Sequence, residues 1–215
     1  MTDEVLASQA DYYQRRASEY DATAYGDVEA ARSRIARIVA EMAPSGSALE
    51  IACGTGLWTE ALARFARMVT AIDAAPDAVA IARERVPAGN VTFEVADVFT
   101  WSAPGRFDVV FFSAWLSHVP SERFAQFWDL LRGLIADGGR VLFLDEHVDE
   151  RAKESYVPGE DEIVERRLED GTAYRIVKNF IDPDAMERRL SELGWDCWIR
   201  RDGTDWVVGE ARPAG

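Results

Sequence analysis

The chain has 215 residues, 48% of them hydrophobic, which is enough to bury the core of one domain without disulfides or structural metals. Its 24 basic and 38 acidic residues give a formal net charge of −14, which repels polyanions and argues against a nucleic-acid partner. No apolar run approaches the roughly 18 residues of a membrane helix, and the start lacks the basic and apolar blocks of a signal peptide. We therefore expect a cytoplasmic protein with no membrane partner.

Strands and helices alternate along most of the chain. Residues 28–42 have helical apolar spacing, and Pro44-Ser45-Gly46 ends that helix. Strands are expected at about 48–52, 68–73, 91–96, 107–112 and 140–145, with helices at about 57–65, 76–86 and 121–135. Asp137-Gly138-Gly139 predicts a turn before the last of these strands. Near-continuous apolar strands separated by helices indicate an α/β protein with a parallel sheet covered on both faces.

The last third departs from this alternation. Residues 146–180 contain two polar-rich segments around Glu169–Thr172, which predict a surface hairpin. A helix is expected at about 183–193, ended by Gly194. Two further strands flank Asp202-Gly203-Thr204 and must be antiparallel, because so short a loop cannot make a parallel crossover.

Gly54 and Gly56 follow the first strand, at the edge of a parallel sheet where ligands usually bind. A Gly-x-Gly pair alone is often only a turn. Three acids, Glu50, Asp73 and Asp97, lie at the ends of successive strands, and such acids commonly accept hydrogen bonds from ribose hydroxyls. They disfavour a pyrophosphate, and the third glycine of a dinucleotide fingerprint is replaced by Thr59. The pattern favours an S-adenosyl sulfonium, which is positively charged and has no phosphates.

The segment Glu50-Ile51-Ala52-Cys53-Gly54-Thr55-Gly56 resembles the first motif of class I S-adenosylmethionine-dependent methyltransferases. The resemblance extends from about Tyr12 to Glu210. It implies one Rossmann-like methyltransferase domain over residues 1–215. It also implies a seven-stranded sheet in the order 3-2-1-4-5-7-6 with the last strand antiparallel. S-adenosylmethionine would be the cofactor and S-adenosylhomocysteine the product.

The resemblance also implies roles for individual residues. Glycines 54 and 56 would pass under the methionine and ribose, Asp73 would hold the ribose, and Ala74, Asp97 and Val98 would line the adenine site. The full expected cofactor set is Glu50, Ala52, Gly54, Gly56, Trp58, Asp73, Ala74, Asp97, Val98 and Ser113. One departure is Ala52, which stands where the family has its first glycine.

Candidate catalytic residues follow from the need to position an acceptor and, for a protonated acceptor, to remove its proton. His118 is the candidate base, although packing at a helix entry before Pro120 and Ser121 is the slightly favoured interpretation. The resemblance implies that residues 1–27 form a lid with Tyr20 near the methyl group, and the 146–180 hairpin is expected over the acceptor. The candidate acceptor residues are Tyr13, Trp115, His147 and Arg175. The acidic residues at 145–150 are interpreted as a solvated loop, so no metal is expected.

The sequence therefore predicts methyl transfer to a small-molecule acceptor, with oxygen favoured over nitrogen, by a monomer or homodimer. The alternatives are a protein or RNA methyltransferase, a binding module without turnover, and a nicotinamide dehydrogenase. The sequence does not identify the acceptor.

Overall fold

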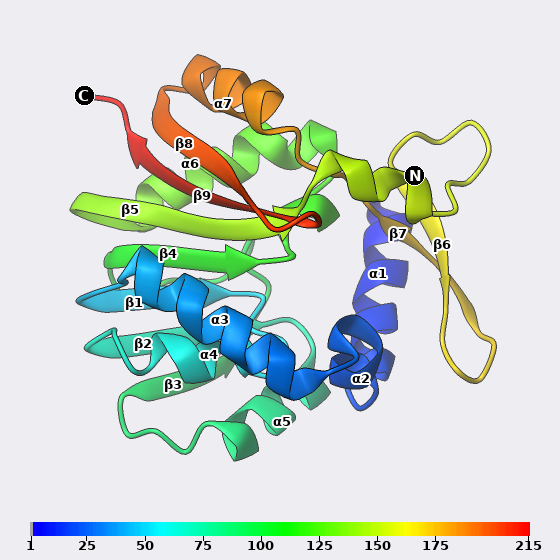
Figure 1. Cartoon of the computed structure of the whole chain (residues 1–215), viewed down its shortest axis with the longest axis horizontal. Coiled ribbons are helices and arrows are strands. Elements are labelled where there is room, and N and C mark those ends of the chain that lie inside the picture. The colour runs from blue at the N-terminus through cyan, green and yellow to red at the C-terminus, as the bar shows by residue number, and fades with distance from the viewer. Residues whose placement is uncertain (1) are drawn as a thin grey trace. The chain divides into compact units, whose positions relative to one another are not determined.

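A computed structural model describes residues 2–215 of the chain (Figure 1). Its strands are β1 (Ser47–Ile51), β2 (Met68–Asp73), β3 (Val91–Val95), β4 (Phe107–Ser113), β5 (Ile135–Glu146), β6 (Ile163–Arg167), β7 (Ala173–Val177), β8 (Trp195–Asp202) and β9 (Trp206–Pro213). The α-helices are α1 (Thr2–Arg16), α2 (Tyr20–Tyr25), α3 (Val28–Met42), α4 (Leu57–Leu62), α5 (Pro76–Arg85), α6 (Phe124–Leu134) and α7 (Pro183–Glu192). Short 3-10 turns are η1 (Leu116–His118), η2 (Ser121–Arg123) and η3 (Val148–Lys153).

Seven strands form one sheet in the order β3-β2-β1-β4-β5-β9-β8, while β6 and β7 form a separate two-stranded sheet. With the hairpin strands left out of the count, this is the order 3-2-1-4-5-7-6. Strand β9 runs antiparallel to β5 and to β8. The Rossmann-like α/β fold, its reversed last strand and the separate hairpin are confirmed.

The chain divides into two compact units. Unit 1 comprises the residues up to Tyr12 together with 112–133 and 140–215, and unit 2 comprises 13–111 and 134–139. Helix α1 and strands β4 and β5 contribute residues to both units. The expected single domain over 1–215 stays a prediction.

Unit 2 contains the parallel pairs β1–β2 and β2–β3. Figure 1 shows α3 running across the face of the sheet at β1 and β2. The Asp27 carboxylate caps α3 by accepting from the backbone N–H groups of Glu29 and Ala30 at 3.1 and 3.0 Å. The buried side chains of α3, Ile35, Ile38, Val39 and Met42, follow helical spacing. They give this helix one apolar face for the core.

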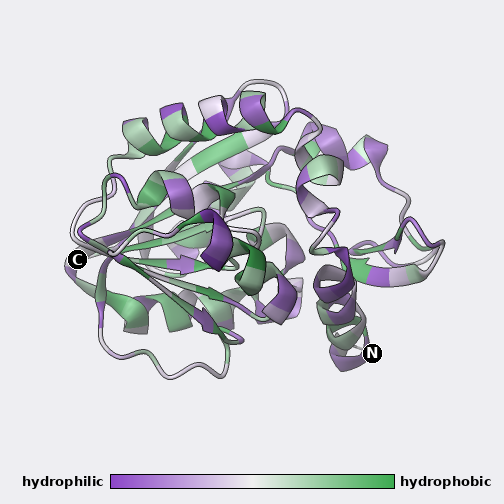
Figure 2. Cartoon of the chain, turned by 90° about the horizontal axis from the view of Figure 1, so that it is seen from below, coloured by the Kyte–Doolittle hydropathy of each residue, from purple (hydrophilic) through white to green (hydrophobic). Residues whose placement is uncertain are grey.

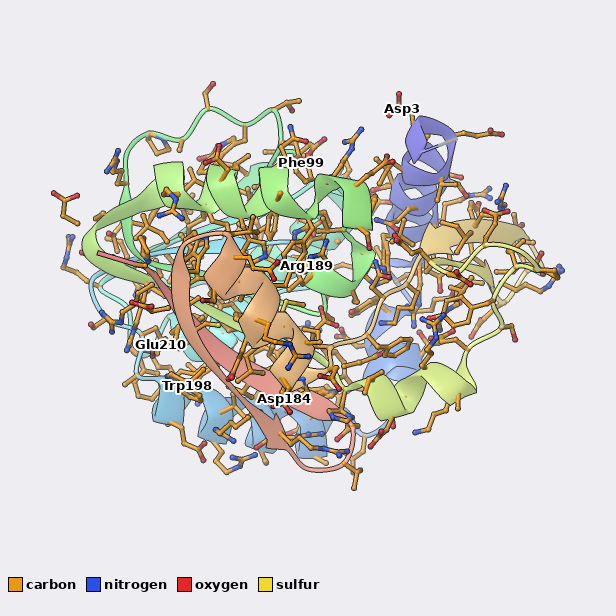
Figure 3. All side chains as sticks on the ribbon, turned by 90° about the horizontal axis from the view of Figure 1, so that it is seen from above. Asp3, Phe99, Asp184, Arg189, Trp198 and Glu210 are labelled. Carbon is orange, nitrogen blue, oxygen red and sulfur yellow. The ribbon has the colours of Figure 1, made fainter. Side chains whose placement is uncertain are left out.

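Unit 1 is built around an aromatic core. The indole of Trp128 on α6 meets that of Trp195 on β8 edge to face, with ring centroids 5.1 Å apart. Figure 3 labels Arg189 on α7, whose guanidinium carbon lies 3.6 Å from the Phe124 ring centroid. It also labels Trp198 and Glu210, which are paired across β8 and β9.

The predicted turn at 137–139 was wrong, because β5 already begins at Ile135. Gly138 has a φ of 76°, which explains the turn-like composition. At Gly139 an added Cβ would lie 2.7 Å from Ile135 Cγ2 and 3.0 Å from the Asp108 carbonyl oxygen. This glycine therefore serves close packing. The predicted helix over 121–135 instead starts as a 3-10 turn and becomes α-helical at Phe124.

Among the helices of residues 2–215, none combines the length and the apolar composition needed to cross a membrane.

Candidate active site

The turn after β1 in unit 2 has left-handed backbone at three residues. Ala52, Gly54 and Gly56 have φ values of 55°, 53° and 84°. The Cys53 N–H donates to the Ile72 carbonyl at 3.0 Å, so pairing with β2 continues into the turn. Helix α4 then begins at Leu57. Every second residue of this turn is in the left-handed conformation, which explains why small residues occupy these positions of the motif.

The Asp73 carboxylate links this turn to the end of β2. Its Oδ2 accepts from the Gly54 N–H at 2.8 Å, and its Oδ1 accepts from the Ala75 N–H at 2.8 Å. Burial raises the pKa of Asp73, while the N–H groups of Ala75, Gly54 and Ala74 oppose that rise. Each carboxylate oxygen retains a second lone pair for a further donor. Asp73 is thus both a clamp for the turn and an available acceptor.

Glu50 lies in β1, two residues before Ala52 of the same turn, and is only 2% exposed. Burial raises its pKa to about 8, the nearby Thr59 hydroxyl opposes the rise, and the Asp73 charge adds to it. Its Oε2 has no hydrogen-bond partner within the described chain. A buried carboxyl with an unused acceptor is costly unless a donor or cation binds there.

The two motif glycines face different surroundings. No described atom lies within 4 Å of a Cβ built on Gly54. The same atom built on Gly56 would lie 2.9 Å from Ala82 Cβ and 3.0 Å from Ala82 Cα. Gly54 therefore borders open space, whereas Gly56 allows α4 to approach α5.

Helix α2 is held against the glycine turn. Thr55 Oγ1 donates to Asp21 Oδ1 at 2.6 Å, and Arg85 forms an ion pair with Asp21. Arg85 also donates to the Thr55 carbonyl at 2.7 Å. One turn further along α2, the Tyr25 hydroxyl accepts from Trp58 Nε1 at 3.3 Å. These contacts attach the expected lid segment to the motif within unit 2.

The aromatic candidates of unit 2 differ in exposure. Trp58 is buried and packs on Phe111, with ring centroids 5.4 Å apart. Tyr13 and Tyr20 are half-buried, their ring centroids 6.4 Å apart, and the Arg16 guanidinium lies 4.9 Å from the Tyr20 ring centroid. Trp58 thus belongs to the core, while the tyrosines keep accessible surface.

The expected adenine side follows β2 and β3. Ala74 is exposed, and Val98 is buried. Asp97 is exposed and accepts from the Phe99 N–H at 2.9 Å, which caps its own loop. Both functions of Asp97, loop capping and ligand contact, stay compatible because a carboxylate accepts several bonds.

The hydrogen-bond acceptors at the turn fit S-adenosylmethionine. Its ammonium group would satisfy the unpaired Glu50 carboxyl, its ribose hydroxyls would donate to Asp73, and Gly54 leaves room for a ligand. A phosphate suits neither acid, because it would be repelled by their ionised forms, whereas a cationic group favours those forms.

In unit 1, His118 on η1 is 6% exposed, and its Nδ1 lies 2.7 Å from the Val177 carbonyl oxygen. A carbonyl oxygen only accepts, so Nδ1 carries the proton and Nε2 is the basic nitrogen of the neutral ring. Ser113 and Trp115 are half-buried, and Trp115 Nε1 is a buried donor without a partner among the described residues. The His118 tautomer with its proton on Nδ1 suits a proton acceptor at Nε2.

His147 and Arg175 already have protein partners. The Nδ1 of His147 accepts from the Asp149 N–H at 3.1 Å and caps η3, so its proton lies on Nε2. Arg175 forms an ion pair with Glu160. Their expected acceptor roles stay predictions. Over the described part of the chain, no group of three or more His, Cys, Asp or Glu side chains could hold a metal ion.

Sequence reasoning missed the burial of a polar group in unit 1. Lys178 is 3% exposed, and its Nζ lies 2.8 Å from Glu146 Oε2 and 3.4 Å from Ser117 Oγ. Asp145 is 1% exposed within β5 and accepts from the Ser117 N–H at 2.9 Å, so the interpretation of residues 145–150 as a solvated loop was wrong at this residue. The signal for Asp145 was an acid near the end of the apolar run Val141-Leu142-Phe143-Leu144, a pattern that also marks Glu50 and Asp73. The burial of Gln9 on α1, which is 6% exposed, was likewise not indicated by the sequence.

Comparisons with known proteins identify the family. The family model described as "Methyltransferase domain" matches residues 48–139. The chain is 31% identical over 166 residues to the ubiquinone biosynthesis O-methyltransferase of Xanthomonas axonopodis pv. citri, covering 75% of this chain and 67% of that relative. The Xanthomonas campestris pv. campestris (strain B100) enzyme of the same name is 41% identical over 81 residues. That alignment covers only 34% of the relative's length.

A solved structure matches the whole chain. The DhpI–SAH complex has a TM-score of 0.87 and 36% sequence identity, with 100% of this chain and 99% of that chain covered. A DhpI–SAM–HEP complex matches with a TM-score of 0.86. The chain therefore belongs to the class I S-adenosylmethionine-dependent methyltransferases. S-adenosylmethionine is the cofactor of this family.

Proposed function

We propose that this protein transfers the methyl group of S-adenosylmethionine to an oxygen atom of a small-molecule acceptor. The observation that carries the proposal is the Gly54–Asp73 clamp beside Glu50, whose Oε2 has no partner among the described residues. These acceptors suit a cationic, ribose-bearing ligand. Oxygen is favoured because the two Xanthomonas relatives described above are named O-methyltransferases. The net charge of −14 supports a small acceptor over a nucleic acid.

When bound, S-adenosylmethionine supplies an activated methyl group on a sulfonium. The chain's own residues have three tasks. Gly54 and Asp73 hold and orient the ligand, and Glu50 neutralises its ammonium group. His118 Nε2 accepts the hydroxyl proton of a protonated acceptor. Tyr13, Tyr20, Trp115, His147 and Arg175 are proposed around the acceptor.

The first test pairs binding with turnover. S-adenosylhomocysteine should bind in calorimetry and NAD should not. Asp73→Asn should weaken that binding by about 5- to 150-fold, since a lost bond to a charged group costs about 1–3 kcal/mol. Asp77→Asn, an exposed carboxylate four residues further along, is the matched control and should bind as the unaltered chain does.

The second test is transfer of a labelled methyl group to a panel of phenols, alcohols and carboxylic acids, their amine counterparts, bulk protein and RNA. Label on the oxygen compounds supports the proposal. Label only on amines, protein or RNA would replace it with an alternative acceptor class. Tight S-adenosylhomocysteine binding with no transfer to any acceptor would favour a binding module, and NAD binding alone would favour a dehydrogenase.

A further inference from the structure

One face of α1 is buried in unit 1, and a polar residue lies at its centre. Val5, Gln9 and Tyr12 follow i, i+4, i+7 spacing and are 4%, 6% and 3% exposed. Figure 2 shows α1 mostly in the hydrophilic colour. A buried amide in such a place must make its hydrogen bonds with the protein.

Gln9 makes them with two distant backbone positions. Its Nε2 donates to the His118 carbonyl at 3.2 Å, across 109 residues of sequence. Its Oε1 accepts from the Val177 N–H at 3.0 Å, across 168 residues. The His118 ring donates from Nδ1 to the Val177 carbonyl at 2.7 Å. The three residues thus form a closed ring of hydrogen bonds.

Each bond in this ring has a fixed direction. The two carbonyl oxygens can only accept and the Val177 N–H can only donate, so the Gln9 amide has one allowed orientation. The same constraint places the His118 proton on Nδ1. Gln9 holds the backbone at both ends of the His118–Val177 bond, and a base whose other nitrogen is fixed in this way keeps one tautomer and one ring orientation.

We infer that Gln9 is a positioning residue that keeps His118 in the tautomer with a basic Nε2. The inference rests on the proposed function only where His118 Nε2 accepts a proton from the methyl acceptor. The tautomer itself can be measured without turnover. A neighbouring contact of α1 offers a control for this effect. Ser8 Oγ accepts from the Arg175 N–H at 3.1 Å, which fastens α1 to β7 without touching His118.

Nitrogen-detected NMR of the two histidines tests the inference. His118 and His147 are the only histidines of the chain, and their expected tautomers are opposite, which makes His147 an internal reference. Spectra recorded above about pH 8, where an ordinary imidazole is neutral, should show His118 protonated at Nδ1 and His147 at Nε2. His147→Gln assigns the signals.

Gln9→Met removes both bonds at similar size. We expect His118 to divide between the two tautomers while His147 stays unchanged, turnover to fall at least tenfold, and the dissociation constant for S-adenosylhomocysteine to change less than twofold. Ser8→Ala should leave the His118 tautomer unchanged. Gln9→Glu keeps the acceptor for Val177 and loses the donor at neutral pH, and it replaces Gln9→Met if that variant does not fold.

The outcomes separate the two proposals. An unchanged His118 tautomer in the Gln9 variant overturns the inference, as does an equal change in Ser8→Ala. A tautomer shift confined to the Gln9 variant supports it. If that shift occurs while the unaltered chain methylates nothing, the positioning role stands and the proposed function fails.

Discussion

Ala52 holds a backbone conformation that glycine adopts with less strain, at a φ of 55°. A side chain in the left-handed region costs about 1–2 kcal/mol, whereas glycine loses about 0.5–1 kcal/mol through its more flexible unfolded chain. We therefore expect Ala52→Gly to raise the free energy of unfolding by roughly 0.5–1 kcal/mol, measured by urea denaturation. Ala48→Gly, within extended β1, should lower it. Destabilisation by both would show that Ala52 is not strained.

Glu50 makes stability depend on pH. Its pKa is about 8 in the folded chain against 4.5 for an ordinary glutamate. Between these values the unfolded chain has released the proton that the folded chain retains, so stability falls as pH rises. The slope is at most about 1.4 kcal/mol per pH unit for this one group, and it ends above about pH 8.

Glu50→Gln should therefore flatten the dependence of unfolding free energy on pH between about 5 and 8. Burial also raises the pKa of Asp73, so a smaller slope of the same sign should persist. Urea denaturation across this range, for both proteins without ligand, makes the comparison. Parallel curves for the two proteins would mean that Glu50 ionises normally in the folded state.

Sequence alone positions some of these residues and not others. Glu50 and Asp73 could be placed because each ends an apolar strand, and parallel strands bring their carboxyl ends to one edge. Gln9 could not, because its partners lie 109 and 168 residues away and nothing local distinguishes it from other polar residues of a helix. The burial of Trp58 likewise depends on its packing with Phe111.

At the scale of elements, Gly54 and Gly56 connect β1 and α4 but have different neighbours. Gly56→Ala would place a methyl group 2.9 Å from Ala82 Cβ, and overpacking α4 against α5 should cost roughly 1–3 kcal/mol of stability. Gly54→Ala meets no described atom within 4 Å beyond its chain neighbours, so it should cost only the left-handed strain less the entropy gained by replacing glycine, a net of roughly 0.5–1 kcal/mol.

The ligand response should have the opposite order. Gly54→Ala adds a methyl group where we propose that the ligand lies. The dissociation constant for S-adenosylhomocysteine should therefore rise more in Gly54→Ala than in Gly56→Ala, although Gly54→Ala loses less stability. Thermal unfolding and calorimetric titration of both variants make the comparison. Equal losses of affinity at equal losses of stability would assign both glycines to packing.

Strand and helix positions were the most predictable elements because their apolar periods are set locally. The antiparallel direction of β8 and β9 followed from the length of the loop between them. The start of β5 did not, because Gly138 and Gly139 have the composition of a turn although Gly139 is required by the closeness of Ile135 and the Asp108 carbonyl. Glycine composition cannot separate a turn from a close approach.

At the scale of the whole molecule, the net charge of −14 should act on ligand binding. S-adenosylmethionine carries one more positive charge than S-adenosylhomocysteine, because only the donor has a sulfonium. A negative field raises the association rate of the cationic ligand, and salt screens that field, with a Debye length of about 10 Å at about 0.1 M.

We therefore expect the association rate constant of S-adenosylmethionine to fall several-fold between about 20 mM and about 300 mM NaCl. That of S-adenosylhomocysteine should change little. Stopped-flow fluorescence would measure both, since seven tryptophans provide the signal. The two ligands differ by one methyl group and one charge, so each is the other's control. Equal salt dependence for both would mean that nearby cations such as Arg85, which lies beside the glycine turn, cancel the global field at the binding site.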